Sequence, residues 1–196
     1  MKPSERELRP EERILEAALD VVMEKTISGT RMHLIAQKVE MVQSNLHYYF
    51  KTKEDLLIGL QNKVLRKCHE LRAMDRKDAE DTLEAQLDIF FNQKRQFLER
   101  YQKYDFAEVD FWVQAQTNER IRTAFAESFS GWRADIGSVL DTYCPDMAPE
   151  KRLMIPAVLV SMLEGATLQY LIDDQSFDLN AYFDFCKKHI LKMATA

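Results

Sequence analysis

Apolar residues recur at helical spacing along almost the whole of this 196-residue chain. Near the N-terminus, for example, Ile14, Leu15, Ala18 and Val22 would share one face of a helix, because residues three, four and seven positions apart lie on the same side. We find no convincing segment in which apolar and polar residues alternate as they do in a strand. Glycine and proline, which interrupt helices, are rare for a chain of this length, with five of each. The sequence therefore predicts an all-α protein.

The periodicity and its interruptions also predict where the helices lie. Residues 1–8 should form a charged, frayed arm. The first helix should then begin at Pro10, which suits a first helical turn, and end near Gly29. Two short helices follow, and a helix over 53–74 then leads to a polar linker at 74–81. Further helices are expected over about 79–103, 104–115, 118–143, 149–173 and 178 to near the end. Four residues are expected to cap helices: Thr30, Thr52 together with Asp55, and Asp178.

The segment 30–53 combines an apolar side with a polar side in a way that favours DNA reading. Its first short helix has apolar residues at helical spacing as far as Val39, and the pattern breaks at Glu40. In its second short helix, Leu46 and Phe50 are the expected inward anchors. The opposite edge carries amides, a hydroxyl and an imidazole: Gln43, Ser44, Asn45 and His47. Such groups can donate to and accept from base edges in the major groove, so the pattern predicts a recognition helix.

This segment, about an eighth of the chain, resembles the helix-turn-helix of the TetR family of bacterial transcriptional regulators. The residues that match the family pattern are Thr30, Ile35, Ala36, Leu46, Tyr49, Phe50, Lys53 and Leu56. Three positions depart from it. Glu40 stands where the family has a glycine that relieves a left-handed backbone, Val42 stands where a serine would cap the second helix, and His47 replaces the usual first aromatic residue. The size and helical layout of the remaining chain also resemble the family.

The resemblance implies a three-helix DNA-binding domain at 1–52 and a larger helical domain for ligand binding and dimerisation at 53–196. It implies a cytoplasmic, homodimeric regulator of transcription, a repressor that a small organic inducer releases from a palindromic operator in double-stranded DNA. No enzymatic activity, cofactor or metal is expected. The rival interpretation is an all-helical ligand-binding or protein-interaction module with a vestigial helix-turn-helix, and the departures at Glu40 and Val42 keep it open.

Charge and residue chemistry suggest how the predicted DNA-binding domain would divide its contacts. From Lys25 to Lys53 there are five basic residues and one acid, a net charge of +4, whereas the chain from Glu54 onward carries −6. The residues expected at phosphates are Thr30, Arg31, Tyr49, Lys51 and Lys53. The residues expected at base edges are Gln43, Ser44, Asn45, His47 and Tyr48. His33 lies in the same stretch and could touch a phosphate or a base, or simply be exposed.

Aromatic residues are unusually dense in the middle of the chain, which suggests a pocket for an organic ligand. The candidate lining residues are Tyr101, Tyr104, Glu108, Phe111, Trp112, Phe129 and Trp132. Aromatic residues at helical spacing also simply fill a core, so this alternative stays open. Asp105, Glu108 and Asp110 lie among the rings, and an inward carboxylate would favour a cationic or hydroxylated ligand, because it needs a partner. The alternative is that Asp105 caps a helix and its neighbours occupy the first turn.

The last two predicted helices carry more apolar residues than the edge of a monomer needs. A four-helix interface between two copies of the chain would use this surface, and the resemblance implies the same arrangement. The residues expected in the interface are Leu159, Met162, Tyr170, Tyr182, Phe183, Cys186 and Ile190. The alternative is that both helices belong to an ordinary core.

Other functional classes lack their usual signals. The three cysteines, Cys68, Cys144 and Cys186, are far apart and odd in number, which favours reduced thiols over disulfides. The four histidines are scattered without metal-ligand spacing, and no Gly-rich phosphate loop or nucleophile motif appears. No run approaches the roughly 20 apolar residues of a membrane span, and the charged N-terminus lacks the apolar core of a signal peptide.

Overall fold

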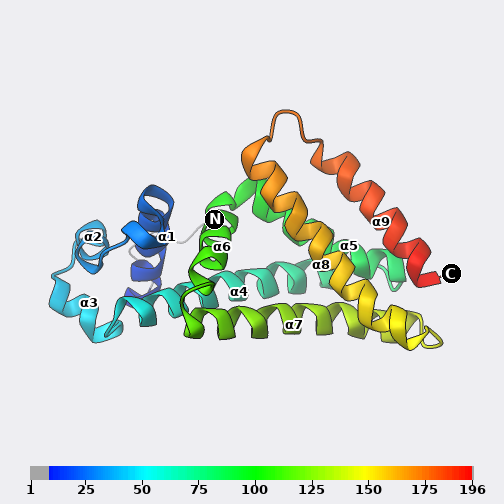
Figure 1. Ribbon diagram of the computed structural model, residues 1–196, viewed down its shortest axis with the longest axis horizontal. Coiled ribbons are helices and arrows are strands. Elements are labelled where there is room, and N and C mark those ends of the chain that lie inside the picture. Colours follow the sequence, from blue (N-terminus) through cyan, green and yellow to red (C-terminus); the bar gives the residue numbers. More distant parts are fainter. Residues whose placement is uncertain (1–8, 196) are drawn as a thin grey trace. The chain divides into compact units, whose positions relative to one another are not determined.

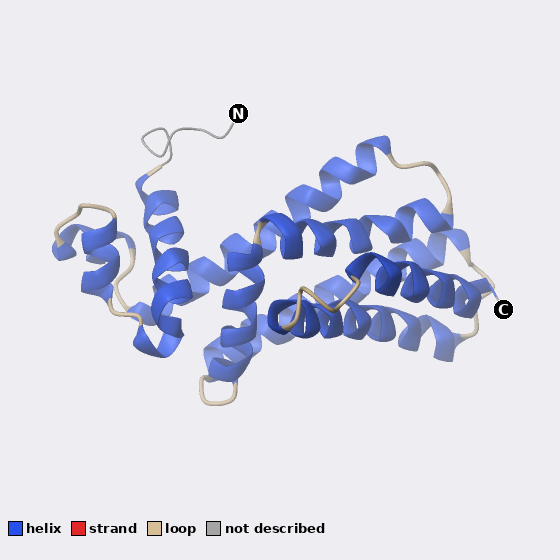
Figure 2. Ribbon diagram, turned by 90° about the horizontal axis from the view of Figure 1, so that it is seen from above, coloured by secondary structure: helices blue, strands red, loops and turns tan. Residues whose placement is uncertain are grey.

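The computed structural model describes residues 9–195, and every regular element in this range is a helix (Figures 1 and 2). The helices are α1 (Pro10–Gly29), α2 (Met32–Lys38), α3 (Gln43–Tyr49), α4 (Lys53–Asp78), α5 (Leu83–Arg100), α6 (Gln102–Ala115), α7 (Glu119–Tyr143), α8 (Pro149–Ile172) and α9 (Leu179–Thr195). The predicted all-α class is therefore confirmed. The arm predicted for residues 1–8 lies outside the described residues.

The chain forms two compact units, and α4, α6 and α7 each contribute residues to both. Of the described residues, the first unit contains 9–67 and 106–124, and the second contains 68–105 and 125–195. The sequence-based domains, 1–52 and 53–196, concern the division of function, and they stay a prediction.

In the first unit, α1 packs against α2, and α2 packs against α3. The two predicted anchors are confirmed, since Leu46 and Phe50 are both buried. The ring of Phe50 lies against the backbone of α4 at Gly59, where an added Cβ would come within 2.8 Å of the ring. A glycine is therefore needed at position 59 for α4 to approach the end of the helix-turn-helix so closely.

The caps predicted for α4 and α9 are confirmed. The Thr52 hydroxyl accepts from the backbone N–H of Asp55 at 3.0 Å, and the Asp55 carboxylate accepts from the backbone N–H of Thr52 at 3.2 Å. This is a reciprocal capping box with an aspartate in the usual glutamate position. At the other end of the chain, the Asp178 carboxylate accepts from the N–H of Ala181 at 2.9 Å.

The predicted linker was placed too early. α4 continues to Asp78 through residues 74–78, where Arg76 and Lys77 favour a helix C-terminus. α5 begins at Leu83, because the Thr82 hydroxyl accepts from the N–H of Ala85 at 3.2 Å and caps the helix. The break therefore occupies residues 79–82. α5 also ends at Arg100, earlier than expected.

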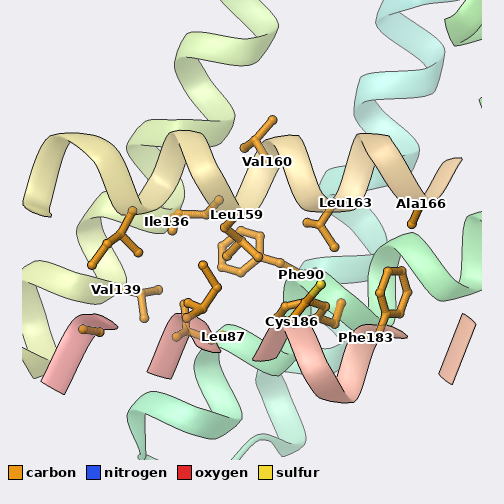
Figure 3. Close-up of a cluster of buried hydrophobic side chains, with 14 of the residues drawn as sticks. Leu87, Phe90, Ile136, Val139, Leu159, Val160, Leu163, Ala166, Phe183 and Cys186 are labelled. Atoms are coloured by element: carbon orange, nitrogen blue, oxygen red, sulfur yellow. The ribbon is translucent and has the colours of Figure 1, made fainter. Parts of the chain in front are cut away.

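The core of the second unit is built where α8 packs against α9 and both pack against α5. Leu159 and Leu163 of α8 point toward Phe90 of α5 and Cys186 of α9 (Figure 3). Side chains from α7, including Ile136, belong to the same buried cluster. Burying these apolar surfaces is the main contribution to the stability of this unit, at roughly 25 cal/mol per Å².

α8 is apolar on most of its surface, and it contains a buried proline, Pro156, within the helix. By length and composition alone this helix could cross a membrane, which corrects the expectation that no segment could. Core helices of proteins outside membranes meet the same criterion. The inner face of α8 is part of the buried cluster of the second unit.

Candidate nucleic-acid interface and ligand site

The turn between α2 and α3 is built without the residues that the family pattern supplies. Glu40 has φ 56°, so the predicted left-handed backbone at this position is confirmed for a residue that is not glycine. Val42 is the N-cap residue of α3, and its side chain makes no capping hydrogen bond, as its apolar character predicts. The N–H of Met41 donates to the carbonyl of Ala36 at 2.9 Å and closes the turn.

α3 presents one polar face to solvent. Gln43, Ser44 and Asn45 are exposed, and Tyr48 is 83 % exposed. The Tyr49 ring stands edge-on to Tyr48, with ring centroids 5.3 Å apart. These five residues include most of the groups that the sequence assigns to base edges.

His47 has a second role within the motif. Its Nδ1 lies 3.1 Å from the carbonyl oxygen of Lys51, and its Nε2 lies 3.2 Å from the side-chain nitrogen of Gln43. The imidazole therefore connects the first turn of α3 to the loop that follows the helix. A contact between His47 and a base stays an untested prediction.

The start of α2 differs from the sequence-based prediction. The N-cap residue is Arg31, which makes no capping hydrogen bond, so the expectation that Thr30 caps this helix was wrong. Thr30 is fully buried, and its hydroxyl donates to the carbonyl of Thr26 at 2.8 Å. Arg31 donates to the carbonyls of Ser28 and Thr30, at 2.7 and 2.9 Å, and stays largely exposed. His33 is exposed.

The two lysines after α3 have different surroundings. Lys51 is exposed. Lys53 is partly buried and donates to the carbonyl of Ile27 at 2.5 Å. Burial, together with the positive charge of Arg31, lowers the pKa of Lys53, and the Asp110 carboxylate partly offsets this effect. Lys53 therefore supports the end of α1, and its contact with a phosphate stays a prediction.

A strained turn near the end of α1 was not predicted from the sequence. Thr26 has φ 59° and ψ 169°, a backbone conformation that glycine adopts far more readily than threonine. The N–H of the next residue, Ile27, donates to the carboxylate of Asp110 in α6. Gln114, one turn further along α6, donates to the Ser28 hydroxyl at 3.0 Å. Two α6 side chains therefore support the segment that precedes α2.

The beginning of α4 is held in the same unit by polar residues around the start of α7. The Asn118 amide donates to Glu54 at 2.7 Å, and Arg120 contacts the carboxylates of Glu54 and Asp55, the latter at 2.9 Å. Asn118 also caps α7 by accepting from the N–H of Ile121 at 3.0 Å. The capping box of α4 and the start of α7 thus form one hydrogen-bonded network.

The second unit contains a buried cluster of charged residues from three helices: Lys94 of α5, Asp105 of α6 and Glu164 of α8. The ammonium of Lys94 lies 3.0 Å from Asp105 Oδ1 and 3.1 Å from Glu164 Oε1. The first contact is a hydrogen bond, and the second is an ion-pair distance without hydrogen-bond geometry. Because α6 begins at Gln102, Asp105 lies within its first turn and is not the residue that caps the helix, so the expected capping role was wrong.

Burial is the main cause of an altered protonation equilibrium in this cluster. It raises the pKa of Asp105 and the pKa of Glu164, and the positive charge of Lys94 offsets part of the effect. The Lys94 ammonium also lies 5.6 Å from the centroid of the Trp132 ring. Lys94 and Glu164 were not predicted from the sequence, because nothing in their local pattern sets them apart from other charged helix residues.

The predicted ligand-lining residues are divided between the two units. In the second unit, Tyr101 and Tyr104 pack with Phe97, with ring centroids 5.6–6.2 Å apart. Phe129 and Trp132 are partly buried and pack against the core. The remaining three belong to the first unit: Glu108, Phe111 and Trp112. Their role in ligand binding stays a prediction for all seven.

The residues predicted for a dimer interface differ in their burial, and their role in an interface stays a prediction. Four of them are buried in the core of the chain itself: Leu159, Phe183, Cys186 and Ile190. Met162, Tyr170 and Tyr182 are partly exposed, and the Tyr182 hydroxyl donates to the carbonyl of Met162 at 3.1 Å. The large apolar side chains that point outward from α8 and α9 are Leu153, Met154, Leu168, Ile172 and Phe185.

Comparisons with known proteins agree with this geometry. Residues 14–60 match the model for "Bacterial regulatory proteins, tetR family", and residues 107–195 match "BetI-type transcriptional repressor, C-terminal". A curated relative, an uncharacterized HTH-type transcriptional regulator in the dhlA 5′ region of Xanthobacter autotrophicus, is 33% identical over 57 residues. The matched part is 29% of this chain and 28% of that relative.

Solved structures with similar folds extend over nearly the whole chain. A putative transcriptional regulator from Pseudomonas aeruginosa PAO1 has a TM-score of 0.85 at 16% identity and covers 98% of this chain and 95% of its own. A putative regulator from Saccharomonospora viridis in complex with choline has a TM-score of 0.78 at 15% identity, with 93% of each chain covered. The transcriptional regulator FadR from Bacillus subtilis in complex with stearoyl-CoA has a TM-score of 0.78 at 18% identity, with 94% of this chain and 97% of that chain covered.

Proposed function

This chain belongs to the TetR family of bacterial regulatory proteins, and we propose that it is a homodimeric transcriptional repressor that a small organic ligand releases from a palindromic operator. The α3 surface carries the proposal. Buried Leu46 anchors the helix, while Gln43, Ser44, Asn45 and Tyr48 remain exposed on it. A short helix that offers amide and hydroxyl groups on one face suits the major groove.

The side-chain environments favour a division of labour at the DNA. Arg31 and Lys51 are exposed cations beside the two short helices, and we assign them to phosphates. We assign base contacts to Gln43, Asn45 and Tyr48. Ser44, at the first turn of α3, would read a base or hold a phosphate.

We propose that the ligand binds in the helical part beyond the DNA-binding segment. Two proteins of similar fold are complexes with choline and with stearoyl-CoA, so the fold accommodates chemically different small molecules. Ligand binding would favour a subunit arrangement in which the recognition helices no longer match the operator. In the first unit, Asp110 of α6 holds the strained turn before α2, so a shift of α6 would disturb the helix-turn-helix.

Dimerisation would use the outward apolar side chains of α8 and α9, which two copies could bury against each other in a cytoplasmic homodimer. A two-fold axis would place the two recognition helices on half-sites about 34–36 Å apart, one turn of DNA.

DNA binding by matched variants tests this proposal. Asn45→Ala should reduce the preference for the operator over random DNA, with little change in the salt dependence of binding. Lys51→Ala should weaken binding to the operator and to random DNA alike. It should also lower the slope of the logarithm of the binding constant against the logarithm of the salt concentration by about 1 per protomer. Lys192→Ala, an exposed lysine on α9, is the control and should change neither. Fluorescence anisotropy over a salt series measures both quantities, and identical effects of Asn45→Ala and Lys51→Ala would contradict the division.

The second candidate is a helical ligand-binding module whose helix-turn-helix no longer reads DNA. The left-handed Glu40 and the uncapped start of α3 are the observations that favour it. It predicts ligand binding with no sequence preference in DNA binding, which the same anisotropy series would detect.

A further inference from the structure

We propose that the buried cluster of Lys94, Asp105, Glu164 and Trp132 binds the ligand of the proposed regulator, and that this ligand is an organic ammonium ion with N–H donors. The inference rests on the proposed function and adds the chemical class of the ligand. All four residues lie in the second unit, on α5, α6, α8 and α7 respectively.

The charge balance of the cluster leaves room for one more cation. Two carboxylates, those of Asp105 and Glu164, share the single ammonium of Lys94. Asp105 is fully buried and Glu164 is only 7 % exposed, so solvent neither screens nor hydrates the excess negative charge. A buried charge without compensation is costly. In the absence of a ligand a proton can supply the compensation, and a ligand cation would take its place.

The hydrogen bonds of the cluster are also incomplete. Asp105 Oδ2 and both carboxylate oxygens of Glu164 are buried without a hydrogen-bond donor among the described residues. Buried polar atoms almost always have a partner. A protonated amine offers two or three N–H donors and the missing positive charge together. An anionic ligand would offer neither, and it would add to the negative charge.

Trp132 supplies the remaining features of a cation site. The Lys94 ammonium lies 5.6 Å from the centroid of its ring, within the range of a cation–π interaction. The cluster therefore already surrounds one ammonium with two carboxylates and an aromatic ring. The indole Nε1 of Trp132 is buried without an acceptor among the described residues. A ligand oxygen beside the ammonium group would satisfy it.

Calorimetric titration of the full-length protein near pH 7 with four probes of equal chain length tests the inference. The probes are n-hexylammonium, n-hexyltrimethylammonium, 1-hexanol and hexanoate. Hexylammonium should bind at least about tenfold more tightly than hexanol, because a hydrogen bond to a charged group contributes more than a neutral one. Hexyltrimethylammonium, which has the charge without N–H donors, should bind between the two, and hexanoate should not bind.

Glu164→Gln keeps the shape of the side chain and removes its charge, so hexylammonium affinity should fall about tenfold or more while hexanol affinity stays unchanged. Asp105→Asn is the second variant, should Glu164→Gln fail to fold by circular dichroism. Glu150→Gln, at the exposed start of the same helix, should bind like the unmodified protein. Equal affinity for hexylammonium and hexanol, or unchanged hexylammonium affinity in the folded cluster variants, would overturn the inference.

Operator binding by the same preparation separates this inference from the proposed function. Sequence-specific DNA binding without hexylammonium binding would refute the ligand class and leave the regulator intact. Hexylammonium binding without any sequence preference in DNA binding would support the ligand site and refute the regulator.

Discussion

Replacing Glu40 with glycine should raise the thermal stability of the protein. Glu40 has φ 56° in the turn between α2 and α3, and its exposed carboxylate makes no hydrogen bond or ion pair with the described residues. A left-handed backbone costs a residue other than glycine about 1–2 kcal/mol. The greater freedom of glycine in the unfolded chain returns about 0.4–1 kcal/mol of this. The difference between these two ranges is centred near 0.8 kcal/mol, so the free energy of unfolding should rise by about 0.8 kcal/mol, and Tm by about 2–3 °C for a chain of this size.

Two controls separate the backbone effect from other effects of the substitution. Glu40→Ala removes the same charge but keeps a Cβ, so it should give little of the gain. Gln37→Gly, at an exposed position inside α2, should instead lower the free energy of unfolding by about 1 kcal/mol. Thermal unfolding followed by circular dichroism measures all three variants. A lower Tm for Glu40→Gly, or an equal gain for Glu40→Ala, would refute the strain argument.

Three further predictions concern the other features of the structure. Asp110→Ala should lower the free energy of unfolding in urea by about 1–3 kcal/mol, because the N–H of Ile27 loses its acceptor, whereas Asp110→Asn, which keeps an oxygen there, should cost less. The raised pKa of Glu164 means that the folded protein holds this proton more tightly than the unfolded chain does. Stability should therefore decline as pH rises above the ordinary carboxyl value of 4.5, and Glu164→Gln should flatten that decline in denaturant titrations over a pH series. Phe185→Lys should shift the mass measured by light scattering from dimer to monomer, whereas Met74→Lys, at an exposed site on α4, should leave it unchanged.

The sequence predicts the features that depend on local pattern. Helical spacing identifies the all-α class and the inward direction of Leu46 and Phe50. The family pattern identifies Glu40 as a position where the backbone turns left-handed. Capping chemistry places the start of α4 at Thr52, because a hydroxyl followed three residues later by a carboxylate is a local signal.

The features missed from the sequence depend on contacts between distant segments. The turn at Thr26 has no sequence signal, because the carboxylate that supports it comes from Asp110 in another helix. Lys94 and Glu164 are likewise ordinary charged residues until folding buries them together. The sequence also did not separate the inner from the outer side chains of α8 and α9, because a helix that is apolar on most sides does not reveal which side faces its own core. Phe183, for example, is buried, whereas Phe185 is 61 % exposed.

Selection of genomic DNA fragments by the purified protein shows whether the α3 surface reads a DNA sequence. The control is the double variant Asn45→Ala with Tyr48→Ala, which removes two exposed groups from α3. The protein is unfolded and refolded before the selection, so that a bound ligand cannot mask DNA binding. We expect the unmodified protein to enrich a two-fold symmetric site and the control to enrich none. Enrichment of no site above the salt-sensitive background, or equal enrichment by the control, would contradict this expectation.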